Sequence, residues 1–153
     1  NPTLRQRVIR MATAMVRHAA RLFVNAAALR VPVFSVVLRR GYGLGAMALT
    51  AGHFHAPVAT AAWPTAEFGA MGLEGAVRLG FRKELEAAGE GREALFQQLL
   101  AQAAERGQAL NMASHLEIDD VIDPAETRAW LCRGLRAVAG VPLAPRRSML
   151  DTW

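Results

Sequence analysis

No aspartate or glutamate occurs in the first 66 residues of the 153-residue chain, although these residues contain eight arginines. Residues 67–153 contain ten basic and thirteen acidic residues, so the two parts carry formal charges of +8 and −3. A basic segment of this kind can attract nucleic acid or another polyanion. However, neither strands with interleaved aromatic residues nor a recognition-helix motif accompanies the charge, so we expect no nucleic-acid partner.

Cysteine is nearly absent, because Cys132 is the only one and cannot form an internal disulfide. Its place within a predicted helix favours a packed small residue over a nucleophile. Nothing in the cysteine content therefore favours a secreted, oxidised protein, and the expected location is the cytoplasm.

Charged residues are also absent from residues 41–66, which makes a membrane span worth testing. Four glycines, two prolines and two histidines interrupt this segment. Such residues predict a turn, a short helix, a strand and another turn, so we expect no association with a membrane.

The remaining pattern predicts one α/β domain. Apolar residues at three- and four-residue steps predict a helix over residues 4–28, and the nearly continuous apolar run over 31–38 predicts a buried strand. A glycine turn, a short helix and a second strand in "HAPVATAAW" follow. These elements belong to an α/β core over residues 31–85, which precedes a helical region over 91–140 and an extended tail over 141–153.

The later part of the sequence predicts three helices. Residues 68–88 start irregularly at their glycines and then form a helix that we expect to be interrupted near Gly80. Residues 92–114 predict one amphipathic helix. Asp123 followed by Pro124 predicts the N-cap and the first position of the last helix.

The stretch "RRGYGLGAMAL" over residues 39–49 is the main candidate for chemistry, because Gly41, Gly43 and Gly45 alternate between a strand and a helix. Such a turn can present backbone N–H groups to a phosphate or to a developing negative oxygen, or it can be only a tight turn. A dinucleotide site would need an acidic residue about 20 positions further on. The first one after Gly41 is Glu67, so the sequence disfavours that alternative.

Candidate metal ligands are few. His53 and His55 would share one face of a strand, but no third ligand follows at a clear spacing. Asp119 and Asp120 could bind a cation or be solvated, whereas Asp123 is better explained as a helix cap. We expect no metal site.

Three segments together resemble one family. They are "VRHAARLFVNAAALRVPVFSVVLRRGYGLGAMAL", "FHAPVATAAWPTAEFGAMGLEGAVRLGFRKELEA" and "EIDDVIDPAETRAWL", in that order from Val16 to Leu131. Their order and spacing resemble the C-terminal part of the carboxyltransferase (beta) subunit of biotin-dependent acyl-CoA carboxylases of the propionyl-, acetyl- and methylcrotonyl-CoA type. The resemblance implies an α/β fold of the crotonase-like class, a spiral of ββα turns, with residues 1–140 forming an incomplete C-terminal carboxyltransferase half.

The resemblance also implies a reaction, the transfer of a carboxylate from carboxybiotin on a partner protein to the α-carbon of an acyl-CoA. This step needs negative charge to be stabilised on the biotin ureido oxygen and on the thioester oxygen. Preorganised backbone N–H groups can do this, and removal of one such donor typically costs about 3–4 kcal/mol.

By the same resemblance, the backbone amides of Leu44 and Gly45 form an oxyanion hole for the biotin oxygen, and Gly41 and Gly43 set the geometry of the turn. Met47 falls where some relatives have a residue that influences the choice of acyl chain. Many relatives have Gly-Gly-Ala where this chain has Gly43-Leu44-Gly45. The other expected pocket residues, for which core packing is the alternative, are Trp63, Phe68 and Met71.

The expected partners follow from the family as well. They are a biotin carboxylase with its biotin carrier, an N-terminal carboxyltransferase half and further copies of the subunit in a homo-oligomer. Because the chain starts with Asn-Pro-Thr and the family's subunit is several times longer, we expect a fragment that is inactive alone.

Two other functions stay open from the sequence. One is a non-catalytic remnant or assembly module that keeps the crotonase-like fold. The other is a different crotonase-fold CoA enzyme, such as a hydratase that uses Glu67 and Glu74 as a carboxylate pair for acid/base chemistry.

Overall fold

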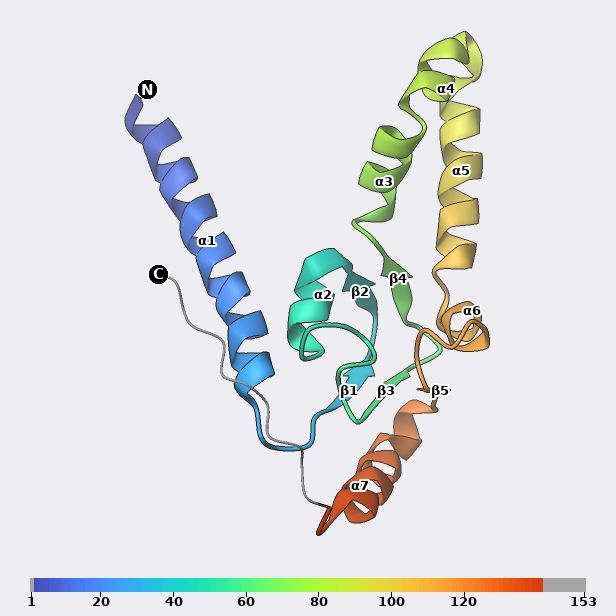
Figure 1. Cartoon of the computed structure of the whole chain (residues 1–153). Coiled ribbons are helices and arrows are strands. Elements are labelled where there is room, and N and C mark those ends of the chain that lie inside the picture. The colour runs from blue at the N-terminus through green and yellow to red at the C-terminus, as the bar shows by residue number, and fades with distance from the viewer. Residues whose placement is uncertain (1, 142–153) are drawn as a thin grey trace.

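The computed structural model describes residues 2–141, and two small parallel sheets form its centre (Figure 1). The first sheet has the order β1-β3-β5, from strands Phe34–Val37, Ala59–Ala62 and Asp120–Val121. The second sheet pairs β2 (Arg40–Tyr42) with β4 (Glu67–Gly69). The expected tail over 141–153 lies outside the described residues except for Val141.

The chain repeats one structural unit. β1 and β2 lead into helix α2 (Gly43–Leu49), and β3 and β4 lead into helix α3 (Leu73–Gly80). The second unit stacks on the first, because β1 pairs with β3 and β2 pairs with β4, both in parallel. The architecture is therefore two successive ββα turns of a spiral, followed by β5, which adds to the β3 edge.

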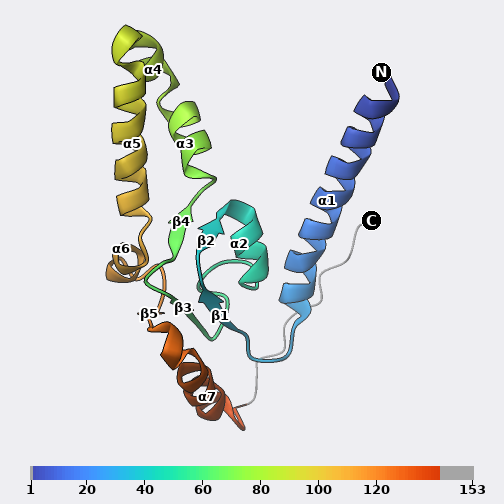
Figure 2. The ribbon, with the colours of Figure 1, turned by 180° about the vertical axis from the view of Figure 1, so that it is seen from behind.

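Helix α1 (Pro2–Ala28) precedes the spiral and lies beside α2 only near its C-terminal end (Figure 2). Ala26 is buried there, whereas Val8, Met11 and Met15 on the predicted apolar face are exposed. The helix starts two residues earlier than the sequence predicts. No helix within residues 2–141 is both long and apolar enough to cross a lipid bilayer.

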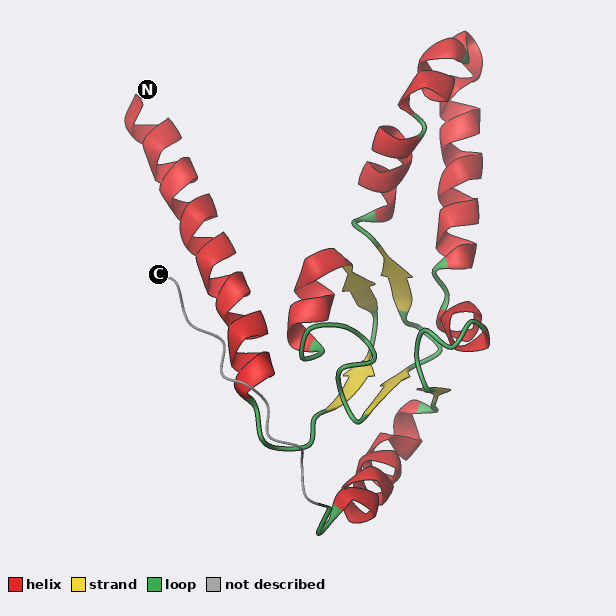
Figure 3. Cartoon of the chain, in the orientation of Figure 1, coloured by secondary structure: helices red, strands yellow, loops and turns green. Residues whose placement is uncertain are grey.

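A helical arm extends from the sheets (Figure 3). It consists of α3, α4 (Arg82–Ala87), a 3₁₀ turn η1 (Gly89–Gly91) and α5 (Arg92–Arg106), with α5 running back alongside α3. The predicted interruption near Gly80 is confirmed. The arm buries a core of its own, made by Val77, Leu85 and Phe96.

The prediction of one helix over residues 92–114 is wrong, because the chain breaks between α5 and α6 (Ala109–Ser114). Strand β4 causes the break. The Phe68 N–H donates to the Gly107 carbonyl at 2.8 Å, and the Ala109 N–H donates to the Ala66 carbonyl at 3.1 Å. These bonds to β4 and to Ala66, the residue before it, replace helical bonds, so α5 ends at the sheet.

The last elements pack against the first strand. A 3₁₀ turn η2 (Pro124–Glu126) leads into α7 (Thr127–Val138), and the Asp123 carboxylate accepts a bond from the Ala125 N–H at 2.8 Å. The predicted cap is thus confirmed. The Phe34 ring on β1 meets the Trp130 ring edge to face, with centroids 5.9 Å apart, which anchors α7 to the sheet.

Candidate active site

Strand β2 continues directly into α2, and this junction contains the glycines singled out in the sequence. Gly41 is not in a loop but buried within β2, and Gly43 is the first residue of α2. The expected three-glycine turn is therefore corrected to a strand-to-helix junction, with Gly45 inside the helix. Tyr42, the N-cap residue, keeps an extended backbone with φ −108° and ψ 132°.

Two of these glycines lie close to neighbouring atoms, Gly41 against side chains and Gly43 against backbone. At Gly41, a Cβ would lie 3.2 Å from Val37 Cγ1 and 3.3 Å from Phe68 Cδ1. Gly43 has φ +57°, and its Cβ would lie only 2.6 Å from the Ala70 carbonyl oxygen. The backbone at Gly43 therefore lies directly against the segment that follows β4, where no side chain fits.

The amides that follow Gly43 point out of the start of α2. The first N–H groups of a helix have no partner within the helix, so those of Leu44 and Gly45 are available as donors. Both residues are exposed, and no atom lies within 4 Å of a Cβ placed on Gly45. The junction can therefore present two backbone donors without a side chain in the way.

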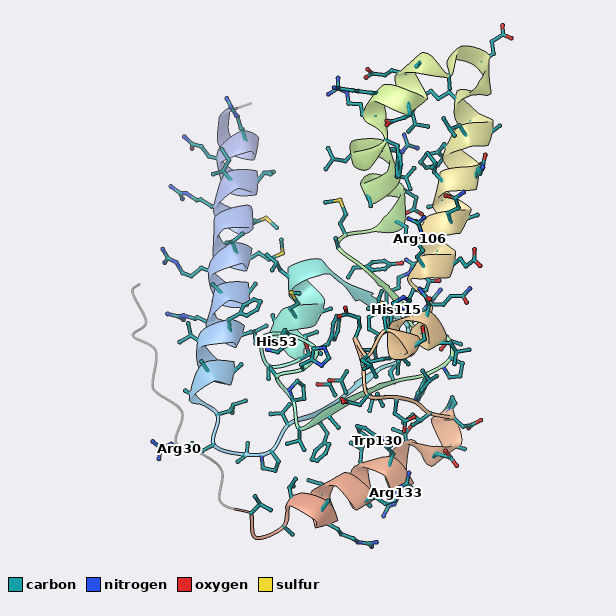
Figure 4. The ribbon with its side chains drawn as sticks, turned by 45° about the vertical axis from the view of Figure 1, so that its right-hand side comes forward. Arg30, His53, Arg106, His115, Trp130 and Arg133 are labelled. Atoms are coloured by element: carbon teal, nitrogen blue, oxygen red, sulfur yellow. The ribbon has the colours of Figure 1, made fainter. Side chains whose placement is uncertain are left out.

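A cavity of about 470 Å³ opens beside this junction, between α2, β4, α5 and α6. This volume lies within the range of small-molecule sites. Its walls are mostly apolar, and its charged members are Glu117 and Arg106. Arg106 is the last residue of α5 and is labelled in Figure 4. The other lining residues are Gly43, Met47, Phe54, Phe68, Gly69, Ala70, Leu73, Ala103, Gly107 and Met112.

The structure brings some of the predicted pocket residues together and separates others. Gly43, Met47 and Phe68 all line the cavity. Met71 lies one residue beyond Ala70 and is 42% exposed. Trp63 lies elsewhere, because its indole Nε1 donates to Thr127 Oγ1 at 2.9 Å at the start of α7.

The sequence analysis did not predict most of the lining residues, and three of these have large apolar side chains, namely Phe54, Leu73 and Met112. Phe54 lies between His53 and His55, so strict alternation along a strand would have placed it opposite both histidines. Leu73 and Met112 come from segments distant in sequence, and no local pattern shows that these meet α2.

Tyr42 and Glu67 form the polar contact closest to the junction. The Tyr42 hydroxyl donates to Glu67 Oε2 at 2.7 Å. Burial, followed by this hydrogen bond and the negative charge of Glu67, raises the pKa of Tyr42 to about 12. The hydroxyl therefore stays protonated, and remains a donor, at physiological pH.

The candidate cation ligands have other roles or no third partner. Asp119 Oδ2 accepts from the Thr60 N–H at 2.7 Å, and Asp123 caps the turn before α7. The His53 and His55 rings lie 6.1 Å apart on an exposed loop. Among residues 2–141 there is no group of three or more histidine, cysteine or acidic side chains arranged to hold a metal ion.

Residues 8–147 match the family model of the carboxyl transferase domain. The chain belongs to this family. It is 36% identical over 123 residues to the carboxyltransferase subunit of propionyl-CoA carboxylase from Haloferax mediterranei, a match that covers 80% of this chain and 23% of that protein. It is 34% identical to the 12S subunit of methylmalonyl-CoA carboxyltransferase from Propionibacterium freudenreichii subsp. shermanii, over 82% of this chain and 24% of that protein. This carboxyl transferase chain thus spans about a quarter of the length of these relatives.

Solved structures of carboxyltransferases share the fold of this carboxyl transferase chain. A single-chain, multi-domain long-chain acyl-CoA carboxylase is 51% identical, with a TM-score of 0.66, over 80% of this chain and 12% of that chain. The transcarboxylase 12S hexamer with methylmalonyl-CoA is 30% identical, with a TM-score of 0.77, over 94% of this chain and 27% of that chain. The crotonase-like fold that the sequence predicts is therefore confirmed.

Proposed function

We propose that this chain supplies the biotin-facing half of a carboxyltransferase site, which transfers a carboxylate from carboxybiotin to the α-carbon of an acyl-CoA. The match of residues 8–147 to the carboxyl transferase domain carries the proposal. The cavity next to Gly43 supports it, because its mostly apolar walls suit an uncharged ring. Leu44 and Gly45 do not line this cavity, but they follow Gly43 directly and are exposed.

In this proposal, the amides of Leu44 and Gly45 donate to the ureido oxygen of biotin. When bound, carboxybiotin supplies the carboxylate that is transferred. Charge grows on its ureido oxygen as that group leaves, so donors fixed in advance stabilise the transition state more than the ground state. Met47 and Phe68 form apolar walls of the cavity. Trp63 and Met71, the other two predicted pocket residues, do not line it.

The proposed partners are a biotin carboxylase with its biotin carrier, an N-terminal carboxyltransferase half and other copies of the subunit, in the cytoplasm. Support comes from the relatives, which include carboxylase subunits and a hexameric transcarboxylase core. In this proposal the chain alone supplies no donors for the thioester oxygen of the acyl-CoA, so it should not complete the transfer.

The first prediction concerns the reverse reaction, assayed with malonyl-CoA or methylmalonyl-CoA and free biotin. The C–C bond to the carboxylate breaks, an N–C bond to biotin forms, and the biotin N–H proton passes to the α-carbon. We expect biotin-dependent turnover from the full-length gene product and none from the 153-residue chain. Absence of turnover in both folded proteins would point to a non-catalytic remnant.

We further propose that the acyl-CoA substrate carries a long-chain acyl group. The supporting observation is the 51% identity to a long-chain acyl-CoA carboxylase over 80% of this chain.

The second prediction follows from this assignment. In the full-length enzyme with its biotin-carrying partner, kcat/KM for palmitoyl-CoA should exceed that for propionyl-CoA by at least about tenfold, because added methylenes contribute favourable burial. Bicarbonate incorporation measures both values. A preference for propionyl-CoA would refute the long-chain assignment but not the carboxyl transfer.

A further inference from the structure

The contact between Tyr42 and Glu67 crosses the second sheet diagonally. In the parallel register of β2 and β4, Arg40 faces Glu67 and Tyr42 faces Gly69. The Tyr42 ring therefore reaches back along β4 to place its hydroxyl 2.7 Å from Glu67 Oε2. The hydrogen bond between the two side chains thus joins the two strands in addition to their backbone pairing.

Gly69, which lies opposite Tyr42 on β4, has no side chain and so leaves room for the Tyr42 ring. A Cβ on Gly69 would lie 3.5 Å from Tyr42 Cδ1 and 3.3 Å from a methyl carbon of Leu73. The ring thus lies close over the backbone of β4. This close approach limits the positions from which the hydroxyl can reach Glu67.

The two bonded residues lie next to the backbone that lines the cavity. Tyr42 directly precedes Gly43, and Glu67 begins the strand that ends at Gly69 and continues to Ala70. Gly43, Gly69 and Ala70 all line the cavity, whereas neither Tyr42 nor Glu67 does. Any effect of this pair on chemistry must therefore act through the backbone and not by contact with a substrate.

We propose that Tyr42 and Glu67 are positioning residues of the carboxyltransferase site. Their hydrogen bond fixes the backbone at Gly43 against that at Gly69 and Ala70, and so keeps one wall of the cavity in its working geometry. This inference rests on the proposed function. It assigns Glu67 a role as hydrogen-bond acceptor, in contrast to the acid/base role open from the sequence.

The third prediction uses variants in the full-length gene product, assayed in the reverse direction. Tyr42→Phe should lower kcat by about ten- to a hundredfold with KM for the CoA substrate within about twofold, because small misplacements affect the transition state most. Glu67→Ala should resemble it, and Glu67→Gln, which keeps an acceptor, should restore most of the turnover. The double variant Tyr42→Phe/Glu67→Ala should be no slower than either single variant, since both remove one interaction.

Thr65→Val is the matched control. Thr65 Oγ1 donates to the Leu38 carbonyl at 2.8 Å, so this variant also removes a hydroxyl hydrogen bond between the two ββα turns, but away from the cavity. Its kcat should equal that of the wild type. Thermal melting of every variant shows that the compared proteins are folded at the assay temperature.

Amide hydrogen exchange provides a readout that does not depend on turnover. Tyr42→Phe should speed exchange several-fold in peptides that cover residues 43–49 and 67–72, whereas Thr65→Val should not. If the wild type shows no turnover, the proposed function fails, and faster exchange still supports the positioning role. Unchanged kcat and unchanged exchange in Tyr42→Phe would overturn the inference. An inactive Glu67→Gln together with an active Tyr42→Phe would also overturn it, because Glu67 would then act as an acid or base.

Discussion

Substitution of Gly43 by alanine is expected to reduce carboxyl transfer at least about a hundredfold while leaving the protein folded. The added Cβ would lie 2.6 Å from the Ala70 carbonyl oxygen, so the backbone must move. In addition, φ at this position is +57°, a conformation that costs an L-residue about 1–2 kcal/mol. Because Gly43 precedes the two proposed donor amides, any shift misaligns them, and loss of one such donor costs about 10²–10³ in kcat.

Gly80→Ala is the control for this prediction. Gly80 is the last residue of α3, has no atom within 4 Å of its Cβ position and needs no positive φ. The variant should keep wild-type turnover and gain slightly in stability, because alanine favours helix more than glycine. Reverse-direction kinetics and thermal melts of both variants provide the test, and a Gly43→Ala enzyme with normal kcat would show that the junction does not hold the reacting groups.

The strand-to-helix junction shows where sequence reasoning succeeded and where it stopped. The alternating glycines after an apolar run correctly indicated that a strand is followed by a short helix. The same reasoning missed β2 and β4, because each has only three residues and includes a glycine. Such short strands show no periodicity of their own and form only because the neighbouring turn of the spiral pairs with them.

Some of the residues that line the cavity could be predicted from the sequence, and others could not. The family resemblance assigned Met47 and Phe68 to the pocket, and both line the cavity beside Gly43. Trp63 belongs to the same sequence motif as Phe68, but it lies at the end of β3 and its side chain bonds to Thr127. Sequence proximity could not separate these two side chains, because their directions depend on the corner between β3 and β4.

The break between α5 and α6 leads to the prediction with the largest expected effect on stability. Gly107 is buried, and a Cβ there would collide with the Phe68 carbonyl oxygen, which is backbone and cannot rotate away. We expect Gly107→Ala to lower the free energy of unfolding by about 2–4 kcal/mol, from overpacking together with a weakened bond between the Phe68 N–H and the Gly107 carbonyl. Urea unfolding followed by circular dichroism measures this difference.

Gly91→Ala at the opposite end of α5 separates this effect from a general sensitivity of the helical arm. No atom lies within 4 Å of the Cβ position of Gly91, so its substitution should change the free energy of unfolding by less than about 1 kcal/mol. Equal stability of the two variants would mean that β4 does not hold the chain at Gly107. Because Phe68 and Gly107 both line the cavity, Gly107→Ala should also lower turnover, which would link the break in the helix to the geometry of the site.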